Sequence, residues 1–90
     1  MLALRNNVEM ARYEAVENGQ LAIVQYTLER DRLNLTYTVM PEALRGRGLG
    51  SRLLQAVLED ARDRGLRVSA RCPFAKAFIA RRREWHGVLV

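Results

Sequence analysis

The sequence predicts a single α/β domain with a mixed sheet, in the order β-β-β-α-β-α and with room for a short final strand. Two turn signals divide the first 40 residues into three segments rich in β-forming residues. A glycine-rich joint then leads into the longest amphipathic segment of the chain, and a short alternating run follows it. Such a helix would connect two parallel strands. We expect residues 1–90 to form one domain with one modest core.

The first two predicted strands are residues 7–17 and residues 20–29. The alternation of apolar residues in the first strand changes phase near Ala11, as it would at a β-bulge. Asn18-Gly19 is a strong hairpin signal between the strands, because both residues tolerate a positive φ. The second strand is apolar on both faces near its middle, so we expect both faces to be covered.

Residues 32–40 form the third predicted strand, after a tight turn at Arg30-Asp31. Pro41 cannot donate to a ladder, so pairing should end there and the three strands should form an antiparallel meander. Alternation is clean in this strand. It places Leu33, Leu35, Tyr37 and Val39 on one face, and Asn34, Thr36 and Thr38 on the other.

The longest predicted helix covers residues 49–64, with Gly65 as the residue that ends it. Asp60 and Arg64 are spaced to form an ion pair on its polar side. Apolar residues recur at helical spacing and should face the core: Leu49, Leu53, Leu54, Val57, Leu58 and Ala61.

The last third of the chain predicts a strand at residues 66–72, a helix at residues 73–83 and a short edge strand at residues 85–90. Pro73 suits the first turn of the second helix. We expect Leu66, Val68, Ala70 and Cys72 to share one face of the strand, and Phe74, Ala77, Phe78 and Ala80 to face inward from the helix.

The net charge of +5 comes almost entirely from arginine, since Lys76 is the only lysine. Basic domains of this size often bind nucleic acid, and a polyanionic nucleotide cofactor would suit the charge equally well. The arginines are interleaved with acidic residues except at Arg81-Arg82-Arg83, and composition alone does not choose between the two partners. The predicted exposed strand face lacks the interleaved aromatic residues that base stacking would use, so a nucleic-acid partner is the less favoured. One cysteine excludes a disulfide framework and no run is long enough to span a membrane, so we expect a cytoplasmic protein without a membrane partner.

The joint before the long helix reads Arg45-Gly46-Arg47-Gly48-Leu49-Gly50. A glycine-rich turn that opens a helix presents backbone N–H groups and the positive end of the helix dipole to a phosphate. A P-loop would need a lysine before Ser51, and the glycine spacing does not fit a dinucleotide fingerprint. A connection without any ligand stays open, although each ordered glycine costs about 0.5–1 kcal/mol relative to alanine.

These residues resemble the GNAT superfamily of acyl-CoA N-acyltransferases, whose pattern at this place is Gln/Arg-x-x-Gly-x-Gly/Ala. Val39-Met40-Pro41-Glu42 resembles the family's strand end, and Leu53-Leu54 its helix core. Over roughly residues 7–90 the chain is similar to the compact, YidJ-like N-acetyltransferases, which carry a Cys-Pro-Phe/Tyr step where this chain has Cys72-Pro73-Phe74. The resemblance implies a minimal GNAT fold.

The resemblance also implies acetyl-CoA as a cosubstrate, an amine acceptor of unidentified structure and no metal. The pyrophosphate would be held by backbone N–H groups at the start of the helix, and the pantetheine arm would pair with the preceding strand. The residues implied in cofactor binding are Val39, Met40, Leu44, Arg45, Gly46, Arg47, Gly48, Leu49, Gly50 and Ser51.

Cys72 and Tyr37 are the candidate catalytic residues. Cys72 matches the cysteine suspected of catalysis in the compact family, as an acetyl carrier or as an acid for the leaving thiolate; the alternative is a small buried core residue. Tyr37 stands where the family often has histidine. Its phenol could protonate a thiolate but is a poor base at neutral pH, and its place in the alternation favours a role in the core. Glu14, Glu29 and Glu42 are further candidates as proton acceptors.

The sequence therefore predicts an acetyl-CoA-dependent N-acetyltransferase. One alternative is a CoA-binding regulatory or interaction domain without catalysis, and another is a small basic module that binds nucleic acid. A homodimer could form through the predicted edge at Val88-Leu89-Val90.

Overall fold

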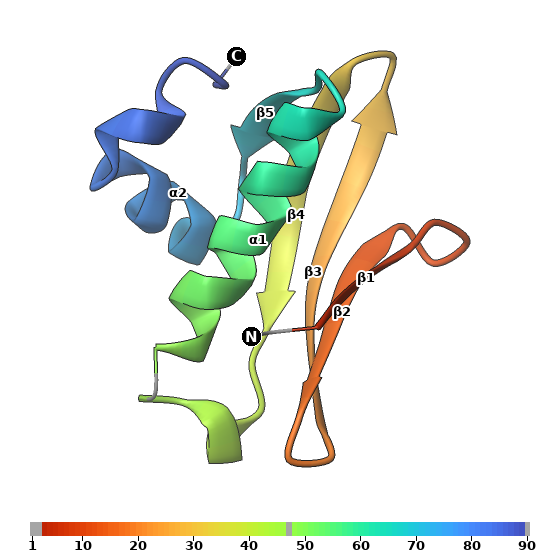
Figure 1. The fold of residues 1–90 in the computed structure, drawn as a ribbon, viewed down its shortest axis with the longest axis vertical. Helices are drawn as coiled ribbons and strands as arrows, with labels where there is room; N and C mark the ends of the chain where they lie inside the picture. The colour runs from red at the N-terminus through yellow and green to blue at the C-terminus, as the bar shows by residue number, and fades with distance from the viewer. Residues whose placement is uncertain (1–2, 47, 90) are drawn as a thin grey trace.

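A computed structural model describes residues 3–46 and 48–89. Five strands form one sheet in the order β1-β2-β3-β4-β5, in which the first four are antiparallel and β5 lies parallel to β4. This mixed α+β architecture is the predicted fold class (Figure 1). The elements are β1 (Leu4–Asn7), β2 (Arg12–Glu17), β3 (Gln20–Glu29), β4 (Arg32–Val39), the 3-10 helix η1 (Glu42–Leu44), α1 (Leu49–Asp63), β5 (Arg67–Ala70), α2 (Pro73–Ala80) and the 3-10 helix η2 (Arg83–Trp85).

The prediction of one bulged strand at residues 7–17 is wrong, because a hairpin turn at residues 8–11 separates β1 from β2. The side chain of Asn7 accepts a hydrogen bond from the backbone N–H of Met10 at 3.2 Å, and Ala11 has a φ of 53°. The phase change near Ala11 therefore marks a turn closed by an asparagine side chain. The two later turns are confirmed, with positive φ at Asn18, Gly19 and Arg30.

One face of the sheet carries both helices and the core, and we call the other its open face. Inward residues of β2, β3, β4 and β5 join the buried side chains of α1 and α2 in one cluster. On the open face Leu21 of β3 is exposed, while its neighbour Ile23 is buried outside that cluster. The expectation that both faces of this strand are covered is therefore confirmed at Ile23 and wrong at Leu21.

A β-bulge in β4 reverses the predicted alternation. Gln25 pairs with Tyr37, but the next residue of β3, Tyr26, pairs with Leu35, so Thr36 is the extra residue between them. Beyond the bulge, Thr38 pairs with the buried core residue Val24. The bulge thus changes which side chains face the helices.

Tyr37 consequently lies on the open face and is 57% exposed. Leu33 and Leu35 face the core as predicted, but Tyr37 and Val39 do not share their face, and Thr38 takes the inward position. The prediction of a core role for Tyr37 is wrong because alternation along a strand holds only while the ladder is regular.

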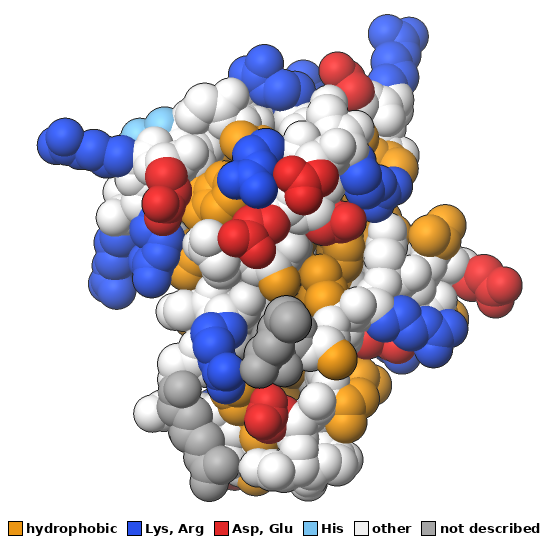
Figure 2. Space-filling model, viewed as in Figure 1, with side chains coloured by type: hydrophobic (Ala, Val, Ile, Leu, Met, Phe, Trp, Pro, Cys, Tyr) orange, Lys and Arg blue, Asp and Glu red, His pale blue; other side chains and the backbone are white. Residues whose placement is uncertain are grey.

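Helix α1 has the predicted inward stripe, and the six residues predicted to form that stripe are all buried. Gly65 follows it with a φ of 72°, and Asp60 and Arg64 are 3.2 Å apart. Acidic and basic side chains are mixed over the outer side of α1 (Figure 2). The positive charge of the chain is therefore not gathered on the helix side.

The inward face of α2 differs from the prediction. Ala75, Phe78 and Ile79 are buried, whereas Ala77 and Ala80 are exposed and Phe74 is 44% exposed. Since almost every residue of this short helix is apolar, its sequence contains two overlapping stripes. Packing against the sheet selects the stripe at i, i+3 and i+4.

The segment after α2 folds back onto the core. Trp85 is 2% exposed, and its indole N–H donates to the Gln55 side-chain oxygen of α1 at 3.1 Å. Leu89 forms a single parallel bridge to Val68, so the predicted final strand is reduced to one bridge, and Val90 lies outside the described residues. Within the described residues, no helix has the length and apolarity needed to cross a membrane.

A hydrogen bond from Tyr13 ties β2 to α1, and its removal should lower stability. Tyr13 is fully buried; its hydroxyl donates to the Asp60 carboxylate at 2.7 Å, and Arg64 lies 3.4 Å away. Burial and then Asp60 raise the pKa of Tyr13 well above its ordinary value. We expect Tyr13→Phe to reduce the free energy of unfolding by about 1–3 kcal/mol in urea titrations, because a hydrogen bond to a charged group is lost.

The matched control is Tyr37→Phe, which removes a hydroxyl from an exposed tyrosine of the same sheet. It should change stability by less than about 0.5 kcal/mol. Equal effects of the two substitutions would contradict a specific role for the bond to Asp60.

Candidate cofactor and catalytic site

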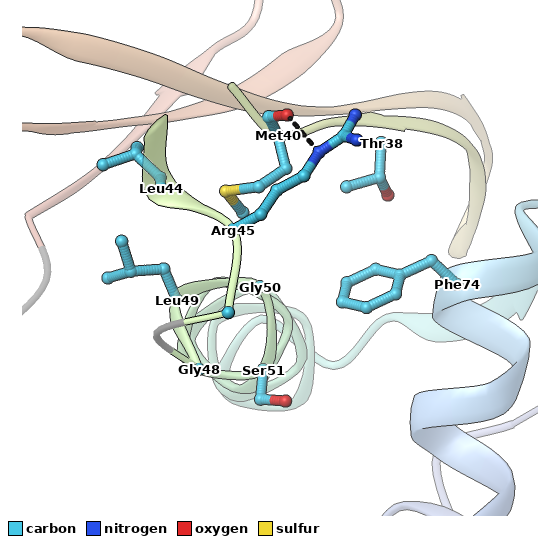
Figure 3. A pocket seen from close by; sticks show the side chains of 10 residues that line it. Thr38, Met40, Leu44, Arg45, Gly48, Leu49, Gly50, Ser51 and Phe74 are labelled. Atoms are coloured by element: carbon cyan, nitrogen blue, oxygen red, sulfur yellow. Dashed lines mark hydrogen bonds between the residues drawn. The ribbon is translucent and has the colours of Figure 1, made fainter. Parts of the chain in front are cut away.

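A pocket of about 410 Å³ lies where the end of β4, the glycine turn and the starts of both helices meet (Figure 3). In Figure 3 the Phe74 ring points from α2 toward Gly50 at the start of α1, and the Arg45 side chain extends toward Met40. The lining residues are Thr38, Met40, Leu44, Arg45, Gly46, Gly48, Leu49, Gly50, Ser51 and Phe74.

The three glycines of the turn are needed for two different reasons. Gly46 and Gly48 have φ values of 79° and 71°, in the left-handed region that disfavours side chains. Gly50 lies inside α1, where an added Cβ would stand 2.5 Å from the Phe74 ring and 3.6 Å from the Met40 methyl group. Two glycines therefore shape the backbone, and the third makes room for side chains.

The start of α1 has the properties of an anion site. Its N-cap residue is Gly48, no side chain among residues 3–46 and 48–89 caps the helix, and its first turn contains no acidic residue. The first N–H groups of a helix have no partner within the helix and carry the positive end of its dipole. Leu49, Gly50 and Ser51 provide these groups at the wall of the pocket.

Most of the sequence-predicted cofactor residues are brought together here. Eight of the ten line the pocket; Val39 does not, and Arg47 lies outside the described residues. The Met40 carbonyl, expected to pair with the pantetheine arm, accepts a hydrogen bond from Nε of Arg45 at 3.3 Å. Sequence reasoning missed Thr38 and Phe74 as lining residues. The bulge in β4 decides where Thr38 points, and the choice of buried stripe in α2 decides where Phe74 points.

Cys72 lies beside this pocket, between the lining residues Thr38 and Phe74. It is 5% exposed, occupies the N-cap position of α2, and its Sγ is 3.3 Å from Oγ1 of Thr38. Burial raises the pKa of the Cys72 thiol, but hydrogen bonds from Thr38 and from the backbone N–H groups of Ala75 and Phe74 outweigh burial. The pKa of Cys72 is therefore below its ordinary value.

The structure does not bring the two candidate catalytic residues together. Cys72 packs on the helix side of the sheet, whereas Tyr37 points from the open face of β4. The polar partner of the thiol is Thr38, the neighbour of Tyr37 in the chain. His86 lies elsewhere, with its ring 3.2 Å from the Ile79 carbonyl oxygen.

The strands β4 and β5 separate beside the pocket. Their pairing ends at Leu35 and Ala70, and the N–H groups of Arg71 and Cys72 both donate to the Leu35 carbonyl oxygen, at 2.8 and 3.3 Å. Strand β4 continues to Val39 without β5. We call this place the β4–β5 fork.

Removing the Thr38 hydroxyl should raise the pKa of Cys72. This hydroxyl stabilises the thiolate by donating to it, so Thr38→Val should shift the pH profile of Cys72 alkylation to higher pH. The midpoint of alkylation by iodoacetamide, followed by mass spectrometry, measures the shift. Thr36→Val is the matched control, since the Thr36 hydroxyl bonds to the Gln25 carbonyl and not to Cys72. An unchanged midpoint in Thr38→Val would contradict the role of this hydroxyl.

Comparison with known proteins agrees with the predicted resemblance. Residues 12–88 match the family model described as GCN5-related N-acetyl-transferase. The solution structure of a GCN5-like protein from Staphylococcus aureus, described as a candidate N-acetyltransferase, is similar to this chain with 28% sequence identity and a TM-score of 0.76. The match covers 99% of this chain and 88% of that one. No curated protein matches the chain. This chain belongs to the GCN5-related N-acetyltransferase family.

Proposed function

We propose that the protein transfers an acetyl group from acetyl-CoA to an amine. The observation that carries the proposal is the uncapped start of α1 at the wall of the 410 Å³ pocket. Pyrophosphate is the part of acetyl-CoA that such a helix start binds. Family membership supports the same cosubstrate, because acetyl transfer is the activity in the family's name.

Different residues of the pocket bind different parts of acetyl-CoA. Backbone N–H groups at Leu49, Gly50 and Ser51 hold the pyrophosphate, and the exposed guanidinium of Arg45 adds positive charge. Thr38 and Phe74 lead from the turn toward the β4–β5 fork, where unpaired backbone of β4 offers hydrogen bonds to the pantetheine amides. The acetyl thioester that acetyl-CoA supplies would then lie near this fork.

Two side chains near the fork are candidates for the proton that the leaving thiolate requires. Cys72 approaches from the helix side and Tyr37 from the open face. Cys72 could act as the acid or as an acetyl carrier, and its lowered pKa favours nucleophilic attack as thiolate. The phenol of Tyr37 could donate a proton to the leaving thiolate.

Titration calorimetry with acetyl-CoA and release of free thiol in the presence of an amine panel test the proposal. We expect saturable binding, and turnover with at least one amine. Cys72→Ala and Tyr37→Phe then assign the roles: loss of turnover with unchanged acetyl-CoA affinity identifies the residue that takes part in the chemistry. Absence of binding at millimolar acetyl-CoA would refute the proposed function.

A CoA-binding domain without catalysis is the second candidate function. It is favoured by one observation: Cys72 is 5% exposed and is not assembled with Tyr37 into a catalytic pair. This candidate predicts binding of acetyl-CoA, no turnover with any amine, and wild-type affinity in Cys72→Ala. Turnover above the uncatalysed rate excludes it.

A further inference from the structure

A second, polar pocket of about 230 Å³ lies on the open face of the sheet. The strand register places it there: Thr27 pairs with Asn34, and Glu29 with Arg32, while the intervening Leu33 points into the core. Ser69 of β5 completes its floor by donating a hydrogen bond to the Asn34 side-chain oxygen at 3.0 Å. This polar pocket shares no lining residue with the 410 Å³ pocket beside the glycine turn.

Three charged side chains line this pocket. Arg32 and Arg71 provide two guanidinium groups and Glu29 provides one carboxylate, and all three are exposed. Within the described residues none of the three forms an ion pair. The pocket therefore offers two cations for an anionic group and one anion for a cationic group, with a net charge of +1.

The pocket adjoins the β4–β5 fork. Ser69 and Ala70 are the last two paired residues of β5, and Arg71 is the first residue beyond the pairing. The N–H of Arg71 donates to the carbonyl of Leu35, the residue after Asn34. A ligand of the pocket would thus lie beside the opening between the two strands, on the open face of the sheet.

We infer that this pocket binds the acetyl acceptor, and that the acceptor is a small primary amine that also carries a carboxylate, of the size of an amino acid. The inference rests on the proposed function. Arg32 and Arg71 bind the carboxylate through charge-assisted hydrogen bonds, and Glu29, at the end of the pocket away from the fork, disfavours a second carboxylate. Polyamines are disfavoured, because they would meet two cations and one anion.

The reaction balances without another reactant. The bound ammonium loses one proton to solvent, and the neutral amine nitrogen forms a bond to the thioester carbonyl carbon. The carbon–sulfur bond breaks, and the second proton of the nitrogen passes to the leaving thiolate. The products are an N-acetyl amino acid, CoA thiol and one proton. Entry of the amine from the open face and of acetyl-CoA from the helix side would bring the two together at the fork.

The test compares each of the twenty amino acids with the amine made by removing its carboxylate, in thiol-release assays with acetyl-CoA. At least one amino acid should be acetylated with a kcat/KM ten or more times that of its decarboxylated partner. Arg32→Gln should raise the KM for this amino acid about 10- to 100-fold with little change in kcat, since a charge-assisted hydrogen bond is lost. The same variant should leave the decarboxylated amine and the acetyl-CoA affinity unaffected. Arg83→Gln, an exposed arginine outside both pockets, is the control.

A readout independent of acetyl-CoA keeps this inference separate from the proposed function. Amino acids titrated alone into labelled protein should shift the amide resonances of Asn34 and Ser69, and Arg32→Gln should abolish the shifts. Absence of these shifts with every amino acid, or equal kcat/KM for amino acids and their decarboxylated partners, would overturn the inference. Shifts at Asn34 and Ser69 without acetyl-CoA binding would support the pocket and refute the proposed function instead.

Discussion

Replacing Gly48 with alanine should weaken acetyl-CoA binding at least tenfold and lower the free energy of unfolding by about 1–2 kcal/mol. Gly48 has a φ of 71° and is the N-cap of α1. An L-residue in this region costs about 1–2 kcal/mol, so the chain should relax toward negative φ. This change would reorient the first N–H groups of the helix. Calorimetric titration and urea unfolding measure the two effects.

Gly19→Ala separates backbone strain from ligand binding. Gly19 has a φ of 75°, an added Cβ would meet no atom within 4 Å, and the same holds for Gly48. Gly19 lies in the hairpin between β2 and β3, outside the pocket. We expect a similar loss of stability but wild-type affinity. Wild-type affinity in Gly48→Ala would show that the helix start does not hold the cofactor.

Trp85→Ala should be strongly destabilising, with a loss of about 3–5 kcal/mol. Trp85 is 2% exposed, donates a hydrogen bond to Gln55, and lies under the guanidinium of Arg62 at 5.5 Å. Domains of this kind have a total stability of only about 5–15 kcal/mol, so the variant should be partly unfolded at mild temperatures. Circular dichroism should follow unfolding, because the substitution removes the single tryptophan.

The control for this prediction is Val8→Ala in the β1–β2 turn, where the side chain is 71% exposed. It should change stability by less than about 0.5 kcal/mol. A loss of less than about 1 kcal/mol in Trp85→Ala would mean that the segment after α2 does not belong to the cooperative core.

The sequence by itself determined the features that depend on neighbouring residues. The inward stripe of α1, the turns at Asn18-Gly19 and Arg30-Asp31, and the glycine turn were all predictable, because φ preferences and the helical period are local. The parallel pairing of β4 with β5 followed from the helix between them. The eight predicted cofactor residues that line one pocket lie around a single short motif, so their proximity was also local.

Only the tertiary structure decided which side chains meet across strands. The bulge at Thr36 depends on the register of β4 against β3, and it placed Thr38 rather than Tyr37 beside Cys72. Helix α2 has two nearly equivalent apolar stripes, and its packing against the sheet decides which one is buried. The stripe that is buried leaves Phe74 directed toward Gly50. The pocket of Glu29, Arg32 and Arg71 joins three strands. Register and packing are set by contacts between distant parts of the chain, and no local pattern encodes them.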